Sequence, residues 1–180
     1  MELKVREMKP EDIENIVDYF ISADEDFLKS MGADADKLPE RNQWISRIKN
    51  ESGKPYEEKK IYYIIWLIDN IPSGHSNINE IEFGISAVMH LHMWRNDNRK
   101  AGIGTGLMKL TIPYYFRNFG LKKLICEPYF YNEAPNKVLK KLGFELKLTY
   151  DTVPGLISFH QTVNRYELTS EMFDKLFKIR

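Results

Sequence analysis

Hydrophobic and polar residues follow two different periods along this 180-residue chain. Apolar residues three and four positions apart follow Pro10 and recur around Trp44, Leu107 and Leu139, which predicts amphipathic helices. Between these segments lie short runs rich in β-branched and aromatic residues, which are typical of strands. The expected strands span residues 3–8, 59–68, 71–83, 85–94, 122–126, 144–152 and 159–169. The order predicts a mixed α/β (α+β) fold, with residues 1–180 forming a single domain.

Several local signals refine this expectation. Pro72 and Gly74 are expected to break the strand region 71–83, and Pro113 to bend or break a helix over 105–119. Residues 22–37 are expected to form a polar lobe. Ser170 is expected to cap a short terminal helix.

The segment 99–106 reads Arg-Lys-Ala-Gly-Ile-Gly-Thr-Gly and continues directly into a helical pattern. Glycines leave backbone N–H groups accessible, and a helix start adds unpaired donors and the positive end of its dipole. These properties predict a phosphate or pyrophosphate site. A P-loop is not matched, because Leu107 and Met108 follow the last glycine where Lys and Ser or Thr are required. A dinucleotide fingerprint is not matched either, because the spacing is Gly-x-Gly-x-Gly and a polar run, 95–100, precedes it.

Two motifs together resemble one family. Arg99, Gly102 and Gly104 fit Arg/Gln-x-x-Gly-x-Gly/Ala, which resembles the acetyl-CoA pyrophosphate loop of the GNAT superfamily of N-acyltransferases. Residues 132–144 are similar to the Asn-x-x-Ser-x-x-Val-Leu-Glu-Lys-Leu-Gly-Phe block of the Rim-type GNATs, the ribosomal-protein N-terminal acetyltransferases. The matching positions are Asn132, Val138, Leu139, Leu142, Gly143 and Phe144, whereas Pro135 and Lys140 depart. The resemblance covers residues 80–168 well.

The resemblance implies the GNAT acyl-CoA N-acyltransferase fold, a central mixed, twisted sheet flanked by helices, with acetyl-CoA as the co-substrate. Pantetheine is expected to pair with backbone groups of a strand that splays from its neighbour, and the pyrophosphate to bind the glycine loop. Lys137 is the expected partner of the ribose phosphate, and Asn132 is expected to orient the pantetheine arm or a water. The expected cofactor-binding residues are Leu91, His92, Met93, Arg99, Lys100, Ala101, Gly102, Gly104, Thr105, Gly106, Asn132 and Lys137.

A general base is expected on the strand before the loop. His90 and His92 lie two positions apart, so their side chains project from the same face. Counting back from Gly102 places this face toward the acceptor amine and the thioester. An ordinary imidazole pKa of about 6.5 suits proton acceptance near neutral pH. His90 and His92 are therefore the expected catalytic residues, with His75 and Glu82 as alternatives and a purely structural or orienting role for the histidines left open.

Protonation of the leaving thiolate is left open by the sequence. Many family members carry a tyrosine four residues before the Gly-Phe pair, where this chain has Leu139. Solvent, Tyr129 or Tyr131 could supply the proton instead, or the thiolate could leave without being protonated.

Composition limits the partners. The 26 basic and 26 acidic residues balance, which argues against nucleic acid or an anionic membrane as a partner. The single cysteine, Cys126, excludes an internal disulfide and a multi-cysteine zinc site, and no third ligand accompanies His90 and His92, so no metal is expected. No signal-peptide pattern is present, and the longest apolar run, 61–68, is too short to span a bilayer. Both observations predict a cytoplasmic protein. The aromatic content leaves room for a homodimer interface.

The expected reaction is direct transfer of an acetyl group from CoA to an amine, either a protein N-terminus or a small amine. Deprotonating an α-amine at neutral pH costs about 1–1.5 kcal/mol, whereas a lysine amine costs about 4–5 kcal/mol, which favours an acceptor of low pKa. The alternatives are a catalytically silent acyl-CoA-binding regulatory domain and a nucleotide-binding domain that uses the same glycines for NAD or ATP.

Overall fold

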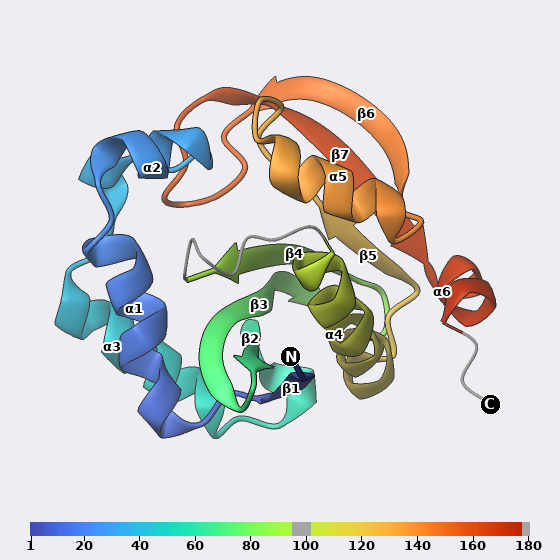
Figure 1. The fold of residues 1–180 in the computed structure, drawn as a ribbon, viewed down its shortest axis with the longest axis horizontal. Coiled ribbons are helices and arrows are strands. Elements are labelled where there is room, and N and C mark those ends of the chain that lie inside the picture. The colour runs from blue at the N-terminus through green and yellow to red at the C-terminus, as the bar shows by residue number, and fades with distance from the viewer. Residues whose placement is uncertain (95–101, 178–180) are drawn as a thin grey trace.

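The protein is described here by a computed structural model that covers residues 1–94 and 102–177 (Figure 1). In this part of the chain seven strands form one sheet in the order β1-β2-β3-β4-β5-β7-β6. The strands are β1 (Leu3–Glu7), β2 (Ile61–Ile68), β3 (Ile71–Glu82), β4 (Ser86–Met93), β5 (Lys123–Cys126), β6 (Glu145–Thr152) and β7 (Gln161–Thr169). Only β4 and β5 pair in parallel, and the other neighbours are antiparallel. The predicted mixed sheet is confirmed.

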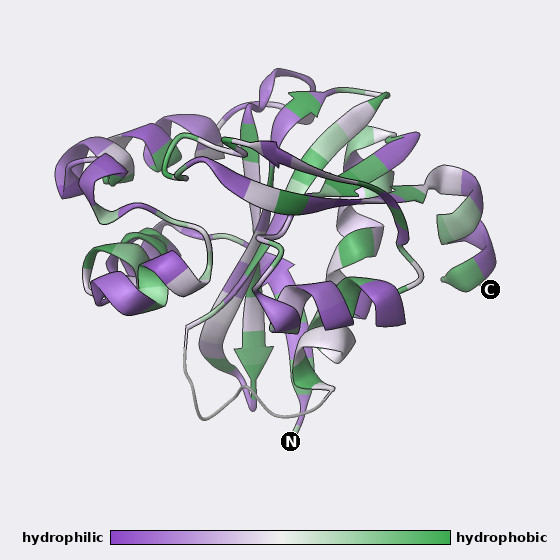
Figure 2. Cartoon of the chain, turned by 90° about the horizontal axis from the view of Figure 1, so that it is seen from above, coloured by the Kyte–Doolittle hydropathy of each residue, from purple (hydrophilic) through white to green (hydrophobic). Residues whose placement is uncertain are grey.

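Helices cover both faces of the sheet (Figure 1). They are α1 (Ile13–Ile21), α2 (Glu25–Ser30), α3 (Arg41–Ser52), α4 (Ile103–Phe119), α5 (Glu133–Lys141) and α6 (Ser170–Leu176), with single 3-10 turns η1 (Pro10–Asp12), η2 (Ala35–Lys37) and η3 (Tyr56–Glu58). The helices carry both hydrophilic and hydrophobic residues (Figure 2), as expected of amphipathic helices that pack on a sheet.

The alternation along β2 divides the core into two layers. Ile64 and Trp66 belong to the apolar cluster beneath α4, whereas Tyr63 and Ile65 belong to the cluster beneath α1 and α3. Both faces of the strand are therefore buried, which explains its almost continuous apolar sequence.

The region 71–83 is not broken, contrary to the sequence expectation. Trp66 pairs with Gly74 and Leu67 with Pro72, so Ser73 forms a bulge that absorbs the irregularity. A Cβ atom at Gly74 would lie 2.6 Å from the backbone oxygen of His92. Glycine is needed here because β3 and β4 approach closely.

Two further expectations are corrected, and the description of one segment is extended. The lobe 22–37 contains α2, whose N-cap Asp24 accepts a hydrogen bond from the Phe27 N–H at 2.7 Å. Helix α4 begins at Ile103 and runs without interruption across Pro113. The cap of α6 is Thr169 rather than Ser170, because the Thr169 hydroxyl accepts from the Met172 N–H at 3.3 Å.

The remaining elements agree with the pattern to within a few residues at each end. Asp69 and Asn70 form the expected turn, both with positive φ, and Gly120 and Gly143 adopt the left-handed conformation after α4 and α5. No helix among residues 1–94 and 102–177 has the length and apolar character needed to cross a membrane.

Candidate active site

The sheet opens between β4 and β5. These strands pair only from Ser86 with Lys123 to Val88 with Ile125, while β4 continues to Met93. The chain after β5 instead follows β7, since Phe130 N–H donates to the Thr162 carbonyl. The predicted splay of the two strands is therefore present beyond Val88.

The backbone N–H and C=O groups of β4 point alternately toward β3 and toward the opening. The His90 carbonyl accepts a hydrogen bond from the Ser76 hydroxyl at 2.6 Å, and Trp94 N–H donates to the Ser73 carbonyl at 3.0 Å. Even-numbered residues thus direct their backbone groups toward β3. The backbone groups of Leu91 and Met93 consequently point to the other side, where β5 has ended, whereas the backbone of His92 does not.

Helix α4 begins beside this opening, and its glycines serve different purposes. Gly102 is the N-cap with φ of 96°, a conformation that favours glycine. Gly106 N–H donates to the Gly102 carbonyl at 2.9 Å, and a Cβ atom at Gly106 would lie 2.8 Å from Leu3 Cδ1. Gly106 therefore packs α4 on β1, and its N–H, expected to bind phosphate, is already used inside the helix.

At position 104, in contrast, packing within the protein does not require glycine. A Cβ atom there would meet Val138 Cγ2 at 3.7 Å, an ordinary contact, and its φ is not positive. Helix geometry leaves the N–H groups of Ile103, Gly104 and Thr105 without acceptors inside α4. Arg99, Lys100 and Ala101, the other expected loop residues, lie outside the described part of the chain.

Three histidines share one face of β3 and β4. His75 pairs with His92, and Asn77 pairs with His90. The His75 and His92 rings lie 4.8 Å apart between centroids, and Phe20 of α1 lies 5.0 Å from His92. The predicted common face of His90 and His92 is confirmed, and His75 joins them.

The three imidazoles differ in their hydrogen bonds. Trp94 Nε1–H donates to His75 Nδ1 at 2.8 Å, and His90 Nε2 lies 3.1 Å from the Asn79 side-chain oxygen. No hydrogen bond joins the ring of His92 to another residue within 1–94 or 102–177. Of the three rings, His92 is therefore the one in which neither nitrogen has a hydrogen bond to a described residue.

Burial keeps all three imidazoles neutral at physiological pH. It lowers the pKa of His75 to about 3 and that of His90 to about 4, and it lowers the pKa of His92 well below 6.5. Neighbouring histidines lower the pKa values of His75 and His92 further. Glu127, at the end of β5, opposes the effect on His90. A neutral imidazole is the form that accepts a proton.

A buried pair of hydroxyl groups connects helix α4 to strands β3 and β4. Tyr115 of α4 donates to the Ser76 hydroxyl at 2.8 Å, and Ser76 in turn donates to the His90 carbonyl. All the side-chain atoms involved are buried. Helix α4, β3 and β4 are thus held in one register, a connection that sequence reasoning missed.

Helix α5 brings two further expected residues close to α4. Asn132 is its N-cap, yet its side chain makes no capping hydrogen bond, so the amide is not consumed by the helix. Lys137 is exposed and ion-paired with Glu133. Val138, next in the chain, is the residue nearest to Gly104 in the contact described above.

An amide network behind α5 also escaped the sequence analysis. Asn136 donates to the carbonyls of Tyr129 and Asn132 at 3.1 and 2.7 Å. Asn164 of β7 donates to the Asn136 side-chain oxygen at 2.8 Å. The network fixes the segment that leads from β5 into α5. It had no signal in a single sequence, because its members come from distant segments.

The lobe formed by residues 22–37 is attached to the C-terminal part of the chain. Lys37 Nζ donates to the Ser158 carbonyl at 2.8 Å, and Gln161 donates to the Gly32 carbonyl at 2.7 Å. The lobe is thereby attached to the start of β7 and to the connection that precedes it (Figure 1).

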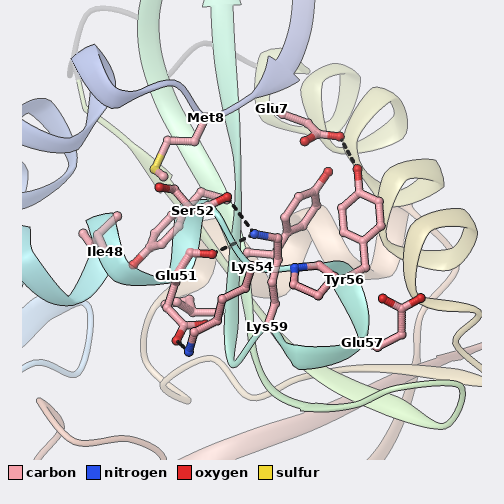
Figure 3. Close-up of a pocket in the computed structure, with 13 residues that line it drawn as sticks. Glu7, Met8, Ile48, Glu51, Ser52, Lys54, Tyr56, Glu57 and Lys59 are labelled. Carbon is pink, nitrogen blue, oxygen red and sulfur yellow. Dashed lines mark hydrogen bonds and ion pairs between the residues drawn. The ribbon is translucent and has the colours of Figure 1, made fainter.

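A pocket of about 300 Å³ lies elsewhere, between α3, η3 and the ends of β1 and β2 (Figure 3). The buried Lys59 amine in its wall donates to the carbonyls of Glu51 and Ser52 at 2.7 and 3.0 Å. Tyr56 donates to Glu7 at 2.7 Å. The polar groups of the pocket wall are therefore hydrogen-bonded to each other. None of the expected site residues lines this pocket. The pocket is accordingly not the candidate active site.

The comparison with protein families decides the assignment. Residues 2–145 match the model described as the acetyltransferase (GNAT) domain. The chain belongs to the GNAT acetyltransferase family. The predicted fold and the prediction of an acetyl-CoA-dependent N-acetyltransferase are thereby confirmed at the level of the family. This result favours acyl transfer over the nucleotide-binding alternative.

Solved structures of GNAT enzymes show the same fold. RimL, a ribosomal L7/L12 alpha-N-protein acetyltransferase in complex with coenzyme A, superposes with a TM-score of 0.75 at 13% identity, covering 94% of this chain and 95% of that chain. Spermidine N-acetyltransferase from Vibrio cholerae, in complex with CoA and spermine, gives 0.77 at 13% identity, covering 95% and 97%. Aminoglycoside acetyltransferase AAC(6')-Ib, in complex with coenzyme A and kanamycin, gives 0.71 at 15% identity, covering 97% and 98%.

These neighbours differ in acceptor, so the likeness concerns the fold alone. A comparison with curated protein sequences finds no match. Within residues 1–94 and 102–177, no three His, Cys, Asp or Glu side chains come close enough to hold a metal ion.

Proposed function

We propose that this GNAT protein transfers the acetyl group of acetyl-CoA to an α-amine, at a protein N-terminus or on a small amine of similar pKa, with His92 as the general base. The amine nitrogen forms a bond to the thioester carbonyl carbon, the carbon–sulfur bond breaks, and CoA leaves as the thiolate. The proton released by the amine passes to His92.

The donor is proposed to lie across the opening between β4 and β5. The directions of the Leu91 and Met93 backbone groups support pantetheine binding there, as a further strand would bind. The first-turn N–H groups of α4 and its dipole support the pyrophosphate site. The position of Gly104 beside α5 supports Lys137 and Asn132 as additional contacts. Arg99, Lys100 and Ala101 stay predicted contacts.

One observation carries the assignment of the base. His92 is the imidazole on this face with neither ring nitrogen hydrogen-bonded to a described residue, whereas Trp94 Nε1–H takes the lone pair of His75, and the Asn79 oxygen accepts from Nε2–H of His90 and holds that ring. A general base needs a free lone pair within reach of the proton that it accepts. His90 is proposed to orient the site rather than to accept the proton, because Asn79 holds its ring in place.

The environment of His92 favours an acceptor of low pKa. Its pKa lies below 6.5, and the interactions that shift it come from burial and from other histidines rather than from a carboxylate. At pH 7 deprotonation of an α-amine costs about 1.4 kcal/mol, whereas deprotonation of a lysine amine costs about 4.6 kcal/mol. A weak base without a carboxylate partner is adequate for the first acceptor but not for the second.

An acceptor panel tests the proposal. Release of CoA and acetylation of the product are measured with a lysine-free peptide with a free N-terminus, the same peptide with a blocked N-terminus and one lysine, spermidine, and kanamycin. We expect the free N-terminus to have the highest kcat/KM. Preference for the lysine peptide, spermidine or kanamycin would contradict the acceptor assignment. Turnover of any amine excludes the silent regulatory domain.

Two variants test the base in the same assay. His92→Gln is expected to lower kcat about 100-fold or more, the range of a general base. His90→Gln, the matched control on the same face, is expected to cost less than about tenfold, because it removes an orienting contact only. Wild-type activity in His92→Gln would refute the assignment.

The remaining expectations stay predictions. A single domain over residues 1–180 is supported by β7, which lies beyond the matched residues 2–145 and still pairs with β5 in the same sheet. The homodimer, the cytoplasmic location and the absence of nucleic-acid and membrane partners are checked by sedimentation and fractionation.

A further inference from the structure

We propose that Trp94 and His75 are positioning residues for His92: the indole N–H fixes the tautomer of His75, and His75 holds the His92 ring in place to receive the proton. This inference rests on the proposed function, in which His92 is the general base. Neither residue is assigned a contact with the substrate.

The geometry joins the three residues across two strands. His75 and His92 are direct cross-strand partners, and their rings are tilted by 30° at a centroid distance of 4.8 Å. His75 is only 1% exposed. Trp94 follows β4 directly, and its indole donates to His75 Nδ1 at 2.8 Å. The His75 ring is thus held by a hydrogen bond from one end of β4 and packs on the ring of His92.

The hydrogen bond determines where the proton of His75 resides. A neutral imidazole has one N–H and one lone pair. The indole is a donor only, so the lone pair of His75 must be at Nδ1 and its hydrogen at Nε2. Protonation of His75 would place a second donor opposite the indole and break this bond. The proton released by the amine therefore has one acceptor in this pair, His92.

The surroundings contain no competing charge among the described residues that contact the pair. Tyr63 of β2 lies 5.8 Å from the His75 ring, and Tyr19 of α1 lies 6.2 Å from His75 and 5.5 Å from His92. His90, on β4, is the other titratable group that acts on both rings. Phe20 completes the packing from α1. The tautomer of His75 is consequently determined by Trp94.

Trp94→Phe removes the indole donor and keeps an aromatic ring. The lone pair of His75 then has no donor, so His75 can change tautomer and its ring is no longer held beside His92. We expect kcat to fall about tenfold, a part of the roughly 100- to 10,000-fold that general-base catalysis contributes. The KM for acetyl-CoA is expected to stay within about twofold, because uniform binding is unchanged.

Trp44→Phe is the matched control. Trp44 packs on Phe20 at 5.2 Å in the same aromatic group, and its indole makes no hydrogen bond to a described histidine. It is expected to leave kcat and its pH profile close to those of the wild type. The double variant Trp94→Phe with His75→Gln is expected to have the kcat of His75→Gln alone, because Trp94 acts through His75.

Imidazole ¹⁵N NMR provides a readout that is independent of turnover. In the wild type the His75 ring is expected as the Nε2–H tautomer, and in Trp94→Phe as a mixture or the other tautomer. An unchanged tautomer, or a changed tautomer with the kcat of Trp44→Phe, would overturn the proposal. If Trp94→Phe does not fold, His75→Gln alone decides: wild-type kcat in that variant overturns the positioning role. Failure of the proposed function is recognised separately, as full activity of His92→Gln.

Discussion

Replacement of Gly104 by alanine should have opposite effects on stability and on ligand binding. The residue lies in the first turn of α4, and a Cβ atom there meets only Val138 at 3.7 Å. The protein itself therefore accepts a methyl group at this position. Glycine within a helix costs roughly 0.5–1 kcal/mol relative to alanine, so Gly104→Ala should raise the free energy of unfolding by up to that amount. For a chain of this size the melting temperature should rise by roughly 1–4 °C.

Binding should change in the other direction. The methyl group would lie beside the N–H donors of Ile103, Gly104 and Thr105, where the pyrophosphate is proposed to approach. Loss of one hydrogen bond to a charged group costs about 1.5–3 kcal/mol. Because 1.4 kcal/mol corresponds to a factor of ten, the Kd for CoA should increase about 10- to 150-fold. Calorimetric titration with CoA and thermal unfolding of the same preparations measure both quantities.

Two other glycines are the controls. Gly53, at the end of α3, has no atom within 4 Å of a built Cβ, so Gly53→Ala should leave the Kd unchanged. Gly106→Ala should destabilise the fold, because its Cβ would lie 2.8 Å from Leu3. A Gly104→Ala protein that is more stable and binds CoA as the wild type does would refute the reasoning. The glycine loop would then be only a helix start.

Three further predictions concern the histidine face and its supports. With an α-amine peptide, kcat/KM should decline as pH falls through the ordinary pKa of the α-amine, about 8, and again through a pKa below 6.5, because burial lowers the pKa of His92 and the neutral imidazole persists above that pKa. His92→Gln should keep the decline that belongs to the α-amine and lack the lower one, and the same two declines in His92→Gln would contradict the account. Lys59→Met should lower the free energy of unfolding in urea by about 1–3 kcal/mol, because two helix-end carbonyls lose their donor, and CoA affinity should not change. Tyr115→Phe should cost about 0.5–1.5 kcal/mol in urea through the lost bond to Ser76, and no loss would show that this buried contact is dispensable.

Periodicity was sufficient for most of the fold, because the long elements carry strong patterns. It failed where a local irregularity is absorbed by a neighbouring element. The strand 71–82 continues through Pro72 because Ser73 forms a bulge opposite β2. Helix α2 was missed because its six residues bury a single side chain, Leu28, so no apolar period marks it.

The candidate site was partly predictable for the same reason. The alternation of side chains along a strand placed His90 and His92 on one face, and the glycine pattern marked the start of α4. The bond from Trp94 to His75 was not predictable, because it depends on the register between β3 and β4. Nor could spacing assign separate roles to Gly102, Gly104 and Gly106, since these depend on φ and on contacts with distant residues.

A crystal structure with bound CoA and an α-amine peptide tests the central claim most directly. The account predicts pantetheine beside Leu91 and Met93, the pyrophosphate at the first-turn N–H groups of α4, and the peptide amine within hydrogen-bond distance of the His92 ring. CoA in the pocket beside Lys59, or an amine placed far from His92, would contradict it.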